Sequence, residues 1–548
     1  MPESSEDAGG RLPEHMTCDV LVVGYGPVGM TCAALLAHYG LDVIAVERHQ
    51  ERYKLHRAGH LDGEIMRVFQ RLGVAEAVEL ASQPLTAMEL RSASGEVLTT
   101  VEPGESGSGW RSDYLAYQPE YEAAIDGRGR ELGVRVLMGV TAESVTQDAS
   151  LARTVVRDTD DPTSRSRAID SRYVIGADGA NSFVRTAIGA VRQDLGFRAV
   201  PHLVVDLEWS DPDADLPWLP EAAQVLDISR PHLEGRWGGR SGARWEFAMR
   251  DDETLEYLEA EETAWKLLAG SGIGPEYGKI TRHTVFTFES SISTPWRAGR
   301  VLLMGDAAHT MPPFAGQGMC SGIRDAENLS WKLADVLAGR ADPVLLDSYE
   351  SEREPHVRTL IGRSMALGST ILTTDPEKAK ARDEMLRSGR APTPEVPRLG
   401  SGIADAGVGS GAADSVAAGR PSLQARVALG TRVDRLDNLL PKQGWRIVSR
   451  HRVPMSLFSP RQLRLLESLQ MQFAHISRGA SGDSSYYDID AEYDRWYRRT
   501  GQKALLERPD HYVFGTAEKI EDLPSLVDEL AAVLAANGWH AAYDPASA

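Results

Sequence analysis

Three glycine-rich stretches of this chain have the residue types that hold phosphates and sugars. They are residues 24–29 (GYGPVG), residues 176–182 (GADGANS) and residues 305–318 (GDAAHTMPPFAGQG). Each follows an apolar run typical of a buried strand. Glycines let a ligand approach the backbone, and the unpaired N–H groups at a helix start attract anions. Taken together, the three stretches predict one phosphate-bearing ligand.

The first stretch has the form GxGxxG in the context that a dinucleotide requires. An apolar strand precedes it, a helical run follows, and the next apolar strand ends at Glu47. Gly24 would allow the tight turn, Gly26 the close approach of a pyrophosphate, and Gly29 the packing of helix on strand. Glu47 would accept hydrogen bonds from a ribose hydroxyl. This stretch alone does not distinguish FAD from NAD.

The third stretch is longer than a connection from a strand to a helix needs. Asp306 follows the strand and could accept hydrogen bonds from a chain of sugar-like hydroxyls. Gly316 and Gly318 leave room for a flat ligand, and the next helix directs its positive end towards it. Read singly, the stretch could also be a connector with Asp306 as a helix cap, and residues 176–182 an ordinary turn.

Composition excludes several classes of protein. The 548 residues are 42% hydrophobic and 25% charged, and the net charge of −20 argues against a nucleic-acid or anionic-membrane partner. The cysteines, Cys18, Cys32 and Cys320, suit a reducing cytoplasm because they are few and odd in number. The acidic start is not a signal peptide, no apolar run is a membrane span, and no metal motif is present. We therefore expect a cytoplasmic protein without a metal site.

The order and spacing of the three stretches resemble those of the FAD-dependent aromatic hydroxylases of the p-hydroxybenzoate hydroxylase type. In that family the first glycine motif is similar to residues 24–29, and the Asp-Gly motif, which touches the FAD pyrophosphate and is implicated in NAD(P)H binding, to residues 176–185. The Gly-Asp motif, whose Asp holds the flavin ribitol, is similar to residues 305–318. The intervening RAGHLDGEIMRVFQRLG and YLAYQPEYEAAI also resemble the family, and the likeness covers roughly residues 18–365.

The resemblance implies a set of FAD contacts. According to this resemblance, the helix that begins near Gly318 would favour the reduced flavin, and Arg185 would lie near the pyrophosphate and the nicotinamide. The residues implied to bind FAD are Gly24, Gly26, Pro27, Gly29, Glu47, Arg48, Arg57, Gln118, Asp178, Arg185, Gly305, Asp306, Pro313, Gly316, Gln317 and Gly318.

The implied fold is α/β and has three parts. They are a Rossmann-like FAD-binding domain, an inserted antiparallel-sheet domain for the substrate and a C-terminal α/β domain that is thioredoxin-like in the family. The last has no cysteine here, so we expect it to serve packing, a possible homodimer or a lid. The expected boundaries are a disordered leader at 1–16, the FAD-binding domain at 17–190 and 299–365, the substrate domain at 191–298, a helix and flexible linker at 366–420, and the C-terminal domain at 421–548.

The resemblance also implies the reaction. NADH or NADPH would reduce the flavin, O2 would form a C4a-hydroperoxide on it, and the distal oxygen would attack a phenolic ring. Within the family the chain is most similar to the 3-(3-hydroxyphenyl)propionate hydroxylases, which predicts a phenylpropionate-type phenol. The alternatives are a polyketide or antibiotic-tailoring hydroxylase, a Baeyer–Villiger enzyme, an oxidase or dehydrogenase, and a flavin-binding protein without turnover. The single complete GxGxxG indicates that NAD(P)H docks transiently.

Residues that touch the substrate are harder to name. The candidates all lie on probable strands of the middle domain, and each could instead belong to the core or the surface; they are His202, Arg244, Trp245, Phe247 and His283. His309, near Asp306, could lie by the flavin or stabilise a turn. Cys320 is expected to be a small buried hydrophobe rather than a catalytic thiol.

Overall fold

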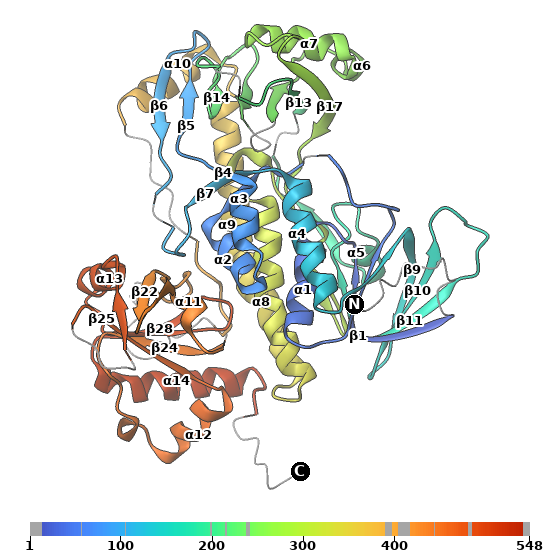
Figure 1. The fold of residues 1–548 in the computed structure, drawn as a ribbon. Helices are drawn as coiled ribbons and strands as arrows, with labels where there is room; N and C mark the ends of the chain where they lie inside the picture. The colour runs from blue at the N-terminus through green and yellow to red at the C-terminus, as the bar shows by residue number, and fades with distance from the viewer. Residues whose placement is uncertain are drawn as a thin grey trace, which may run out of the picture.

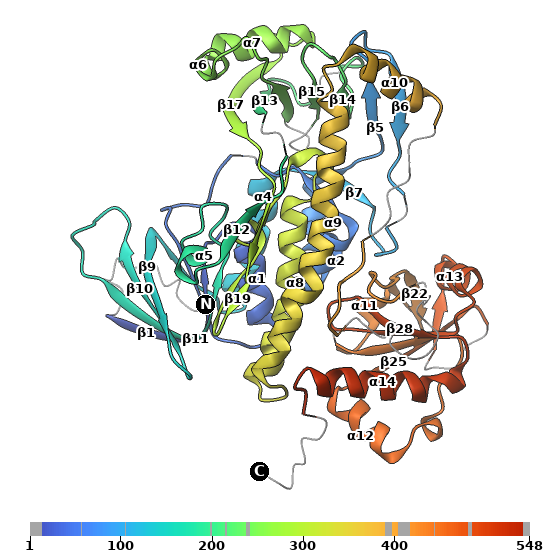
Figure 2. The same cartoon turned by 180° about the vertical axis from the view of Figure 1, so that it is seen from behind.

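The computed structural model describes residues 14–540 except 56, 105, 198–199, 214–215, 237–241, 390–396, 404–416, 443 and 480–484. Two long helices, α8 (Gly318–Leu337) and α9 (Asp347–Ile371), run through the middle of the molecule. Figures 1 and 2 show the sheet around β1 on one side of them and the C-terminal part on the other. No helix in the described part of the chain is long and apolar enough to cross a membrane.

The first sheet is mainly parallel, with the central order β19-β20-β11-β1-β2-β8. Strand β1 is buried on both sides, which explains its continuous apolar run. Strands β9 and β10 extend this sheet next to β11 in antiparallel fashion. Its strands are β1 (His15–Val23), β2 (Val43–Glu47), β8 (Arg135–Met138), β9 (Val140–Gln147), β10 (Ala152–Asp158), β11 (Arg167–Gly176), β19 (Arg297–Ala298) and β20 (Val301–Leu303).

Strand register brings the three glycine-rich stretches to one edge of this sheet. Val23 pairs with Gly176, and Gly176 pairs with Leu303, so the three strands end at the same level. The glycine-rich stretches follow these three positions. Ligands of open parallel sheets bind at the carboxyl ends of their strands.

The helices of this part pack on both faces of the sheet, and the closest contact is between α1 and α8. A Cβ atom on Gly322 would lie 2.5 Å from a methyl group of Val28. The chain turns at Gly73, whose φ is 77°, and this turn separates α2 from α3. The remaining helices here are α1 (Pro27–His38), α2 (Gly63–Leu72), α3 (Ala75–Leu80), α4 (Gln118–Glu131) and α5 (Phe183–Ala187).

The second large sheet has the order β17-β13-β16-β15-β14-β5-β6. Its strands β5 (Met88–Arg91) and β6 (Val97–Val101) come from before the expected insertion, and β5 joins β14 in parallel. Helices α6 (Leu255–Glu259) and α7 (Glu261–Gly270) cover one face. The other strands are β13 (Pro201–Trp209), β14 (Ala222–Val225), β15 (His232–Gly235), β16 (Gly242–Ala248) and β17 (Gly278–Thr287).

Two small sheets join these parts. One has the order β3-β7-β4 and the other β12-β18-β21. Their strands are β3 (His60–Asp62), β4 (Ser82–Pro84), β7 (Asp113–Ala116), β12 (Val191–Asp194), β18 (Ser291–Thr294) and β21 (His309–Thr310).

The C-terminal part has its own sheet, ordered β23-β22-β26-β25-β24-β27-β28. Strands β24, β25 and β26 are parallel, and the β27–β28 hairpin adds to β24 in antiparallel fashion. The strands are β22 (Arg426–Leu429), β23 (Arg432–Arg435), β24 (Arg446–Ser449), β25 (Gln472–Ser477), β26 (Tyr486–Asp488), β27 (Ala504–Glu507) and β28 (Val513–Ala517). The helices are α11 (Leu436–Leu439), α12 (Pro460–Ser468), α13 (Glu492–Thr500) and α14 (Leu523–Ala536).

The expected linker at 366–420 holds the end of α9 and all of α10 (Pro376–Arg387). Much of the rest of it lies outside the described residues, as do residues 1–13 of the expected leader.

Candidate FAD and substrate site

A pocket of about 590 Å³ lies between the carboxyl edge of the first sheet and the inner face of the second. All three glycine-rich stretches line it, through Gly26, Ala177, Gly179, Asp306, Gly316 and Gly318. Apolar side chains from both sheets and from the third stretch complete the wall, among them Leu85, Met88, Leu233, Phe288 and Phe314. The size and apolar lining are typical of a site for a cofactor or small molecule.

The three glycines of the first stretch have different surroundings. Gly24 has a φ of 97°, and a Cβ atom there would lie 2.4 Å from the carbonyl oxygen of Ala177. A Cβ atom on Gly29 would lie 2.1 Å from the oxygen of Gly24, so both glycines are needed by the fold itself. At Gly26, by contrast, a Cβ atom would meet nothing within 4 Å. The backbone at Gly26, just before Pro27 opens α1, therefore faces open pocket space.

Glu47 lies at the end of β2, beside the first stretch. Its carboxylate accepts hydrogen bonds from the backbone N–H of Tyr25 (2.9 Å) and of His49 (3.0 Å). Arg48 is exposed, its Nε lies 3.4 Å from Nε2 of His49, and it is not among the residues that line the pocket.

The second stretch is held by Asp178. One oxygen of its carboxylate accepts a hydrogen bond from the Ser182 hydroxyl, and the other accepts one from the backbone N–H of Val184 (3.1 Å) at the start of α5. Burial raises the pKa of Asp178. Arg185 donates to the carbonyl of Ala180 (2.8 Å) and to that of Ala307 (3.3 Å), so it joins the second stretch to the third.

The third stretch presents Asp306 to the pocket from a 3-10 turn, Gly305–Ala307. Among the described residues, no side chain or backbone group forms a hydrogen bond or ion pair with its carboxylate. Asp306 is exposed to the pocket, and desolvation by the surrounding pocket wall raises its pKa. An unpaired acid in such a place is a ready acceptor for ligand hydroxyls.

The remainder of this stretch shapes the start of α8. Pro313 opens a second 3-10 turn, which ends at Gly316 with a φ of 64°. A Cβ atom on Gly316 would lie 3.0 Å from the ring of His60. Gln317 is the N-cap residue of α8, and Gly318 is its first residue, so the positive end of this helix faces the pocket.

These features fit FAD. The open backbone at Gly26 lies next to the start of α1, where phosphates are favoured. The unpaired carboxylate of Asp306 suits a hydroxylated chain, and the glycines at 316 and 318 leave a wall without side chains for a flat ring.

Two further residues implied to bind FAD, Arg57 and Gln118, also line the pocket. Gln118 Oε1 accepts hydrogen bonds from the backbone N–H of Arg57 (2.9 Å) and of Ala58 (2.8 Å). Gln118 therefore fixes the backbone of this segment. The Arg57 guanidinium lies 3.7 Å from the centre of the Tyr53 ring.

On the second sheet the side chains alternate, and the pocket receives one face of β16. Arg244 and Glu246 line the pocket. Trp245 and Phe247 point the other way into the core under α6 and α7, where both are buried. Trp245 and Phe247, which the sequence offered as candidate substrate contacts, therefore face the core and not the pocket.

His283 is misplaced for the same reason. It pairs with Val205, which belongs to the core under α6 and α7. His202 is buried behind the pocket wall, with its ring 5.0 Å from Phe288 and 6.1 Å from Phe314, both of which line the pocket. Burial lowers the pKa of His202 to about 4, so it is neutral at ordinary pH.

Arg244 reaches the pocket but is already bound by protein. Its guanidinium donates two hydrogen bonds to the Asp206 carboxylate (2.7 and 3.0 Å) and one to the carbonyl of Arg57 (2.6 Å). Arg282 adds a second positive charge 3.6 Å from Asp206.

The sequence did not single out His60, Asp113 or Glu246. His60 Nε2 lies 2.6 Å from Asp113 Oδ1, and His60 Nδ1 lies 3.0 Å from the carbonyl oxygen of Gly316. Because both partner atoms accept, each ring nitrogen carries a proton. Burial opposes this, but the bond to Asp113 raises the pKa of His60 well above its usual value. Glu246 is buried enough that its pKa is raised.

His309 and Cys320 have structural surroundings. His309 Nε2 lies 2.7 Å from Asp325, whose same oxygen accepts the N–H of Gly305 (3.1 Å), and the imidazole lies against Trp296. Cys320 is fully buried on α8, which raises the pKa of its thiol. In the described part of the chain, no group of three or more His, Cys, Asp or Glu residues is placed to hold a metal ion.

Comparisons with known proteins agree with this geometry. A family described as "FAD binding domain" matches residues 17–364, and one described as "HcaD C-terminal domain" matches residues 419–533. A probable NADH-specific resorcinol 4-hydroxylase from Rhodococcus jostii is 34% identical over 94% of this chain and 95% of its own length. A 3-(3-hydroxy-phenyl)propionate/3-hydroxycinnamic acid hydroxylase from Mycolicibacterium smegmatis is also 34% identical, over 67% of this chain and 64% of its own length.

Solved structures show the same fold. The flavin-dependent monooxygenase PieE, solved with FAD and substrate, matches with a TM-score of 0.78 at 20% identity. The match covers 95% of this chain and 99% of PieE, so it includes the C-terminal part.

Proposed function

Because this chain belongs to the FAD-dependent aromatic hydroxylases, we propose that it hydroxylates an uncharged dihydroxybenzene of the resorcinol type with NADH and O2. A relative that matches over 95% of its own length is named for resorcinol and NADH. The structural observation that carries the proposal is the pairing of Arg244 with Asp206.

This pairing decides which charge the substrate can carry. A carboxylate in an apolar pocket needs a cation to compensate its desolvation. Arg244 is already held by Asp206 in a bidentate ion pair, in which Arg282 shares the same carboxylate. Among the described residues that line the pocket, the other arginine is Arg57, which we assign to FAD. Acceptors for hydroxyl groups, in contrast, are present as Asp113 and Glu246.

A phenylpropionate-type phenol is the second candidate, because several relatives at 33–35% identity carry that name. The carboxylate of such a substrate would have to replace Asp206 as the partner of Arg244. For the antibiotic hydroxylases the likeness is one of fold, at 20–22% identity.

Bound FAD would supply the redox chemistry, taking a hydride from NADH and activating O2 so that one oxygen atom passes to an electron-rich ring. We assign the start of α1 at Gly26 to the pyrophosphate, Glu47 to a ribose and Asp306 to the ribityl hydroxyls. The start of α8 would lie by the pyrimidine end of the ring, and Arg185 beside the docking path of NADH.

The protein would handle the proton of the substrate. A phenolate is richer in electrons than a phenol, so a base near the ring hydroxyl accelerates attack. We assign this role to Asp113, whose side chain is 28% exposed and lines the pocket. The doubly protonated His60 holds Oδ1 of Asp113 and leaves Oδ2 to accept the proton. Glu246, which also lines the pocket, would accept a hydrogen bond from the second hydroxyl.

For the C-terminal part we propose a thioredoxin-like fold. The β24-α12-β25 unit is parallel, and the β27–β28 hairpin adds to β24 before the final helix, as in a thioredoxin core. Since this part contains no cysteine, thiol exchange has no place in its function.

The test follows NADH oxidation by the purified, FAD-loaded protein. We expect slow oxidation alone and fast oxidation with resorcinol, with a product one oxygen atom heavier. 1,3-Dimethoxybenzene is the matched control, because it has no hydroxyl proton, and 3-(3-hydroxyphenyl)propionate tests the second candidate. If no phenol changes the rate and no product gains oxygen, the chain is an oxidase or a dehydrogenase. A colourless protein that does not take up FAD would contradict the cofactor assignment as well.

A further inference from the structure

The C-terminal part reaches the central helices through the turn that joins β27 to β28, residues 508–512. Arg508 forms two hydrogen bonds of 2.8 Å with Glu352 of α9. Asp510 accepts a hydrogen bond of 3.1 Å from Asn328 of α8. The Tyr512 hydroxyl donates a hydrogen bond of 2.6 Å to Oε1 of Glu64 on α2. One turn therefore contacts three helices of the FAD-binding part.

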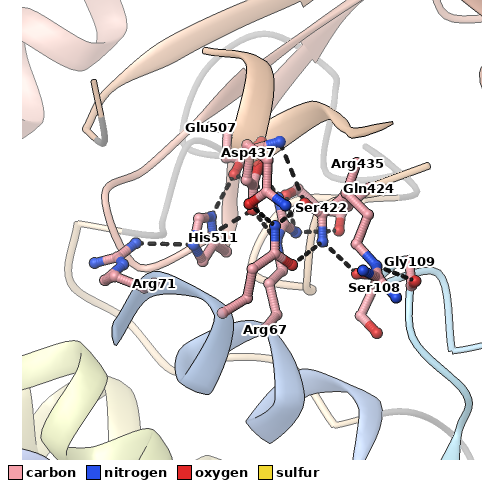
Figure 3. A network of polar contacts seen from close by, with 12 residues as sticks. Arg67, Arg71, Ser108, Gly109, Ser422, Gln424, Arg435, Asp437, Glu507 and His511 are labelled. Carbon is pink, nitrogen blue, oxygen red and sulfur yellow. Dashed lines mark hydrogen bonds and ion pairs between the residues drawn. The ribbon is translucent and has the colours of Figure 1, made fainter. Parts of the chain in front are cut away.

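A second contact area holds α2 against the same C-terminal sheet (Figure 3). Arg67 donates to Asp437 (2.7 and 3.1 Å) and to the carbonyl of Ser422 (2.8 Å). His511 lies between Arg71 and Glu507, at 2.8 and 2.9 Å. These side chains are buried, so α2 and the C-terminal part share a buried polar contact area.

From Tyr512 a continuous set of charged hydrogen bonds leads to the pocket. The other oxygen of Glu64 accepts a bond of 2.6 Å from Nε of Arg324 on α8. Arg324 donates in turn to Oε1 of Gln317 (3.0 Å) and to Asp62 (2.6 Å). Asp62 also accepts from Nε2 of Gln317 (3.2 Å). Both ends of the Gln317 amide are therefore fixed.

Gln317 lies between Gly316 and Gly318, and both glycines line the pocket. Glycine leaves this backbone few constraints of its own. Its position is set instead by Gln317 on one side and by the bond from His60 to Gly316 on the other. Three hydrogen bonds in sequence, from Tyr512 to Glu64, from Arg324 to Glu64 and from Arg324 to Gln317, connect the Tyr512 hydroxyl to the side chain of Gln317.

We propose that Tyr512 is a positioning residue for FAD, acting through Glu64, Arg324 and Gln317. The C-terminal part would then set the backbone wall at the start of α8 rather than serve packing alone. The inference rests on the assignment of this pocket to FAD.

The test compares Tyr512→Phe with Tyr493→Phe. Tyr493 is a matched control because it is also buried, and its hydroxyl donates to the carbonyl of Leu423 (3.1 Å), away from α8. The apoproteins are titrated with FAD, and the visible spectrum of bound flavin is recorded. We expect Tyr512→Phe to raise the Kd of FAD about three- to tenfold, the size of effect seen for one member of such a network. Its flavin bands should shift, while Tyr493→Phe keeps both wild-type values.

A double-mutant cycle adds a second measurement. Glu64→Gln should weaken FAD binding, and the two changes together should cost less than the product of their separate factors, because both act on one path. By reciprocity, FAD should slow hydrogen exchange at residues 508–513.

Two outcomes overturn the proposal: an unchanged Kd and spectrum in Tyr512→Phe, or an equal loss of affinity in Tyr493→Phe. The pocket assignment is tested separately, because Asp306→Ala must lose FAD whether or not Tyr512 acts on it.

Discussion

Asp206 accepts hydrogen bonds from Arg244 with both carboxylate oxygens, and Arg244 presents this ion pair at the pocket wall. The pair is positioned by register, because the two residues are opposite each other on β13 and β16. To bind Arg244, a substrate anion would therefore have to compete with Asp206, which forms two hydrogen bonds with Arg244 and belongs to the same sheet.

Asp206→Asn should change the charge preference of the pocket. The amide leaves Arg244 without its counter-charge, so KM for 3-(3-hydroxyphenyl)propionate should fall relative to KM for resorcinol. Breaking a buried ion pair should also lower the free energy of unfolding by about 3 kcal/mol, measured in urea. Glu208→Gln is the control, because Glu208 is exposed on the same strand. An unchanged ratio of the two KM values would contradict the assignment of substrate charge.

Gly26→Val should separate folding from cofactor binding. A Cβ atom at Gly26 would meet no protein atom within 4 Å, so we expect the apoprotein to fold with near-normal stability while the pyrophosphate site is blocked. Gly24→Ala is the contrasting variant, since its Cβ atom would lie 2.4 Å from Ala177 O and the backbone has a φ of 97°. It should be destabilised by more than about 1 kcal/mol. Circular dichroism melting and flavin content distinguish the two effects, and a yellow Gly26→Val protein would contradict the phosphate assignment.

Asp306→Ala should weaken FAD binding at least tenfold. Loss of a charge-assisted acceptor for a hydroxyl costs about 1.5–3 kcal/mol. Asp306→Asn keeps an acceptor oxygen of the same shape and should retain more affinity, as measured by equilibrium dialysis. Full flavin occupancy in both variants after dialysis would show that the ribityl chain lies elsewhere.

Asp113→Asn should remove the proton acceptor without emptying the FAD site. At neutral pH we expect kcat to fall about 10²-fold or more, the usual contribution of a general base. As the pH approaches about 10, where a phenol ionises by itself, the variant should recover most of this loss. A pH-rate profile of the loaded enzyme checks this, and a loss of equal size at every pH would mean a structural role for Asp113.

His511→Asn should make the protein less sensitive to acid. Burial and the nearby Arg67 lower the pKa of His511 to about 3, and Arg71 donates to its Nε2. In the unfolded chain the same imidazole takes up a proton near pH 6.5. The unfolded state therefore binds more protons between about pH 6.5 and 3, and stability falls as the pH falls through this window.

Without this imidazole, the loss should be smaller by up to about 1.4 kcal/mol per pH unit, as followed by urea unfolding at several pH values. His451→Asn, at an exposed position of the same part, should keep the wild-type slope. Equal slopes in the wild type and His511→Asn would contradict the buried neutral state.

The meeting of the three glycine-rich stretches at one pocket was predictable, because each stretch has its own local residue pattern. At Gly24 a strand, glycines at fixed offsets and a helix start lie within a few residues of one another, and after β20 the same features are spread over the longer stretch that ends at Gly318. The substrate face was not predictable in this way. Alternation in β16 shows that Arg244 and Trp245 face opposite sides, but it does not say which side is the pocket. The polar pair Arg244 and Glu246, separated by a buried aromatic residue, was the available signal.

Contacts between residues far apart in the chain could not be predicted, because the sequence around one residue does not indicate its distant partner. The partner of His60 is 53 positions away, in Asp113, and the partner of Glu64 is 448 positions away, in Tyr512. Likewise, β5 and β6 join the second sheet from outside the expected insertion, since the pairing of β5 with β14, and of β6 with β5, depends on the closed fold.

The level ends of β1, β11 and β20 have a consequence for biosynthesis. The glycine-rich stretches begin at residues 24, 176 and 305, so they emerge from the ribosome at widely separated times. A nascent chain that lacks α8 has two walls of the pocket but not the third, and most of the protein must be made before the vitamin-derived group can be captured. The supply of the vitamin precursor of FAD during expression should therefore determine what fraction of the completed chains bind the cofactor, and not how many chains are synthesised.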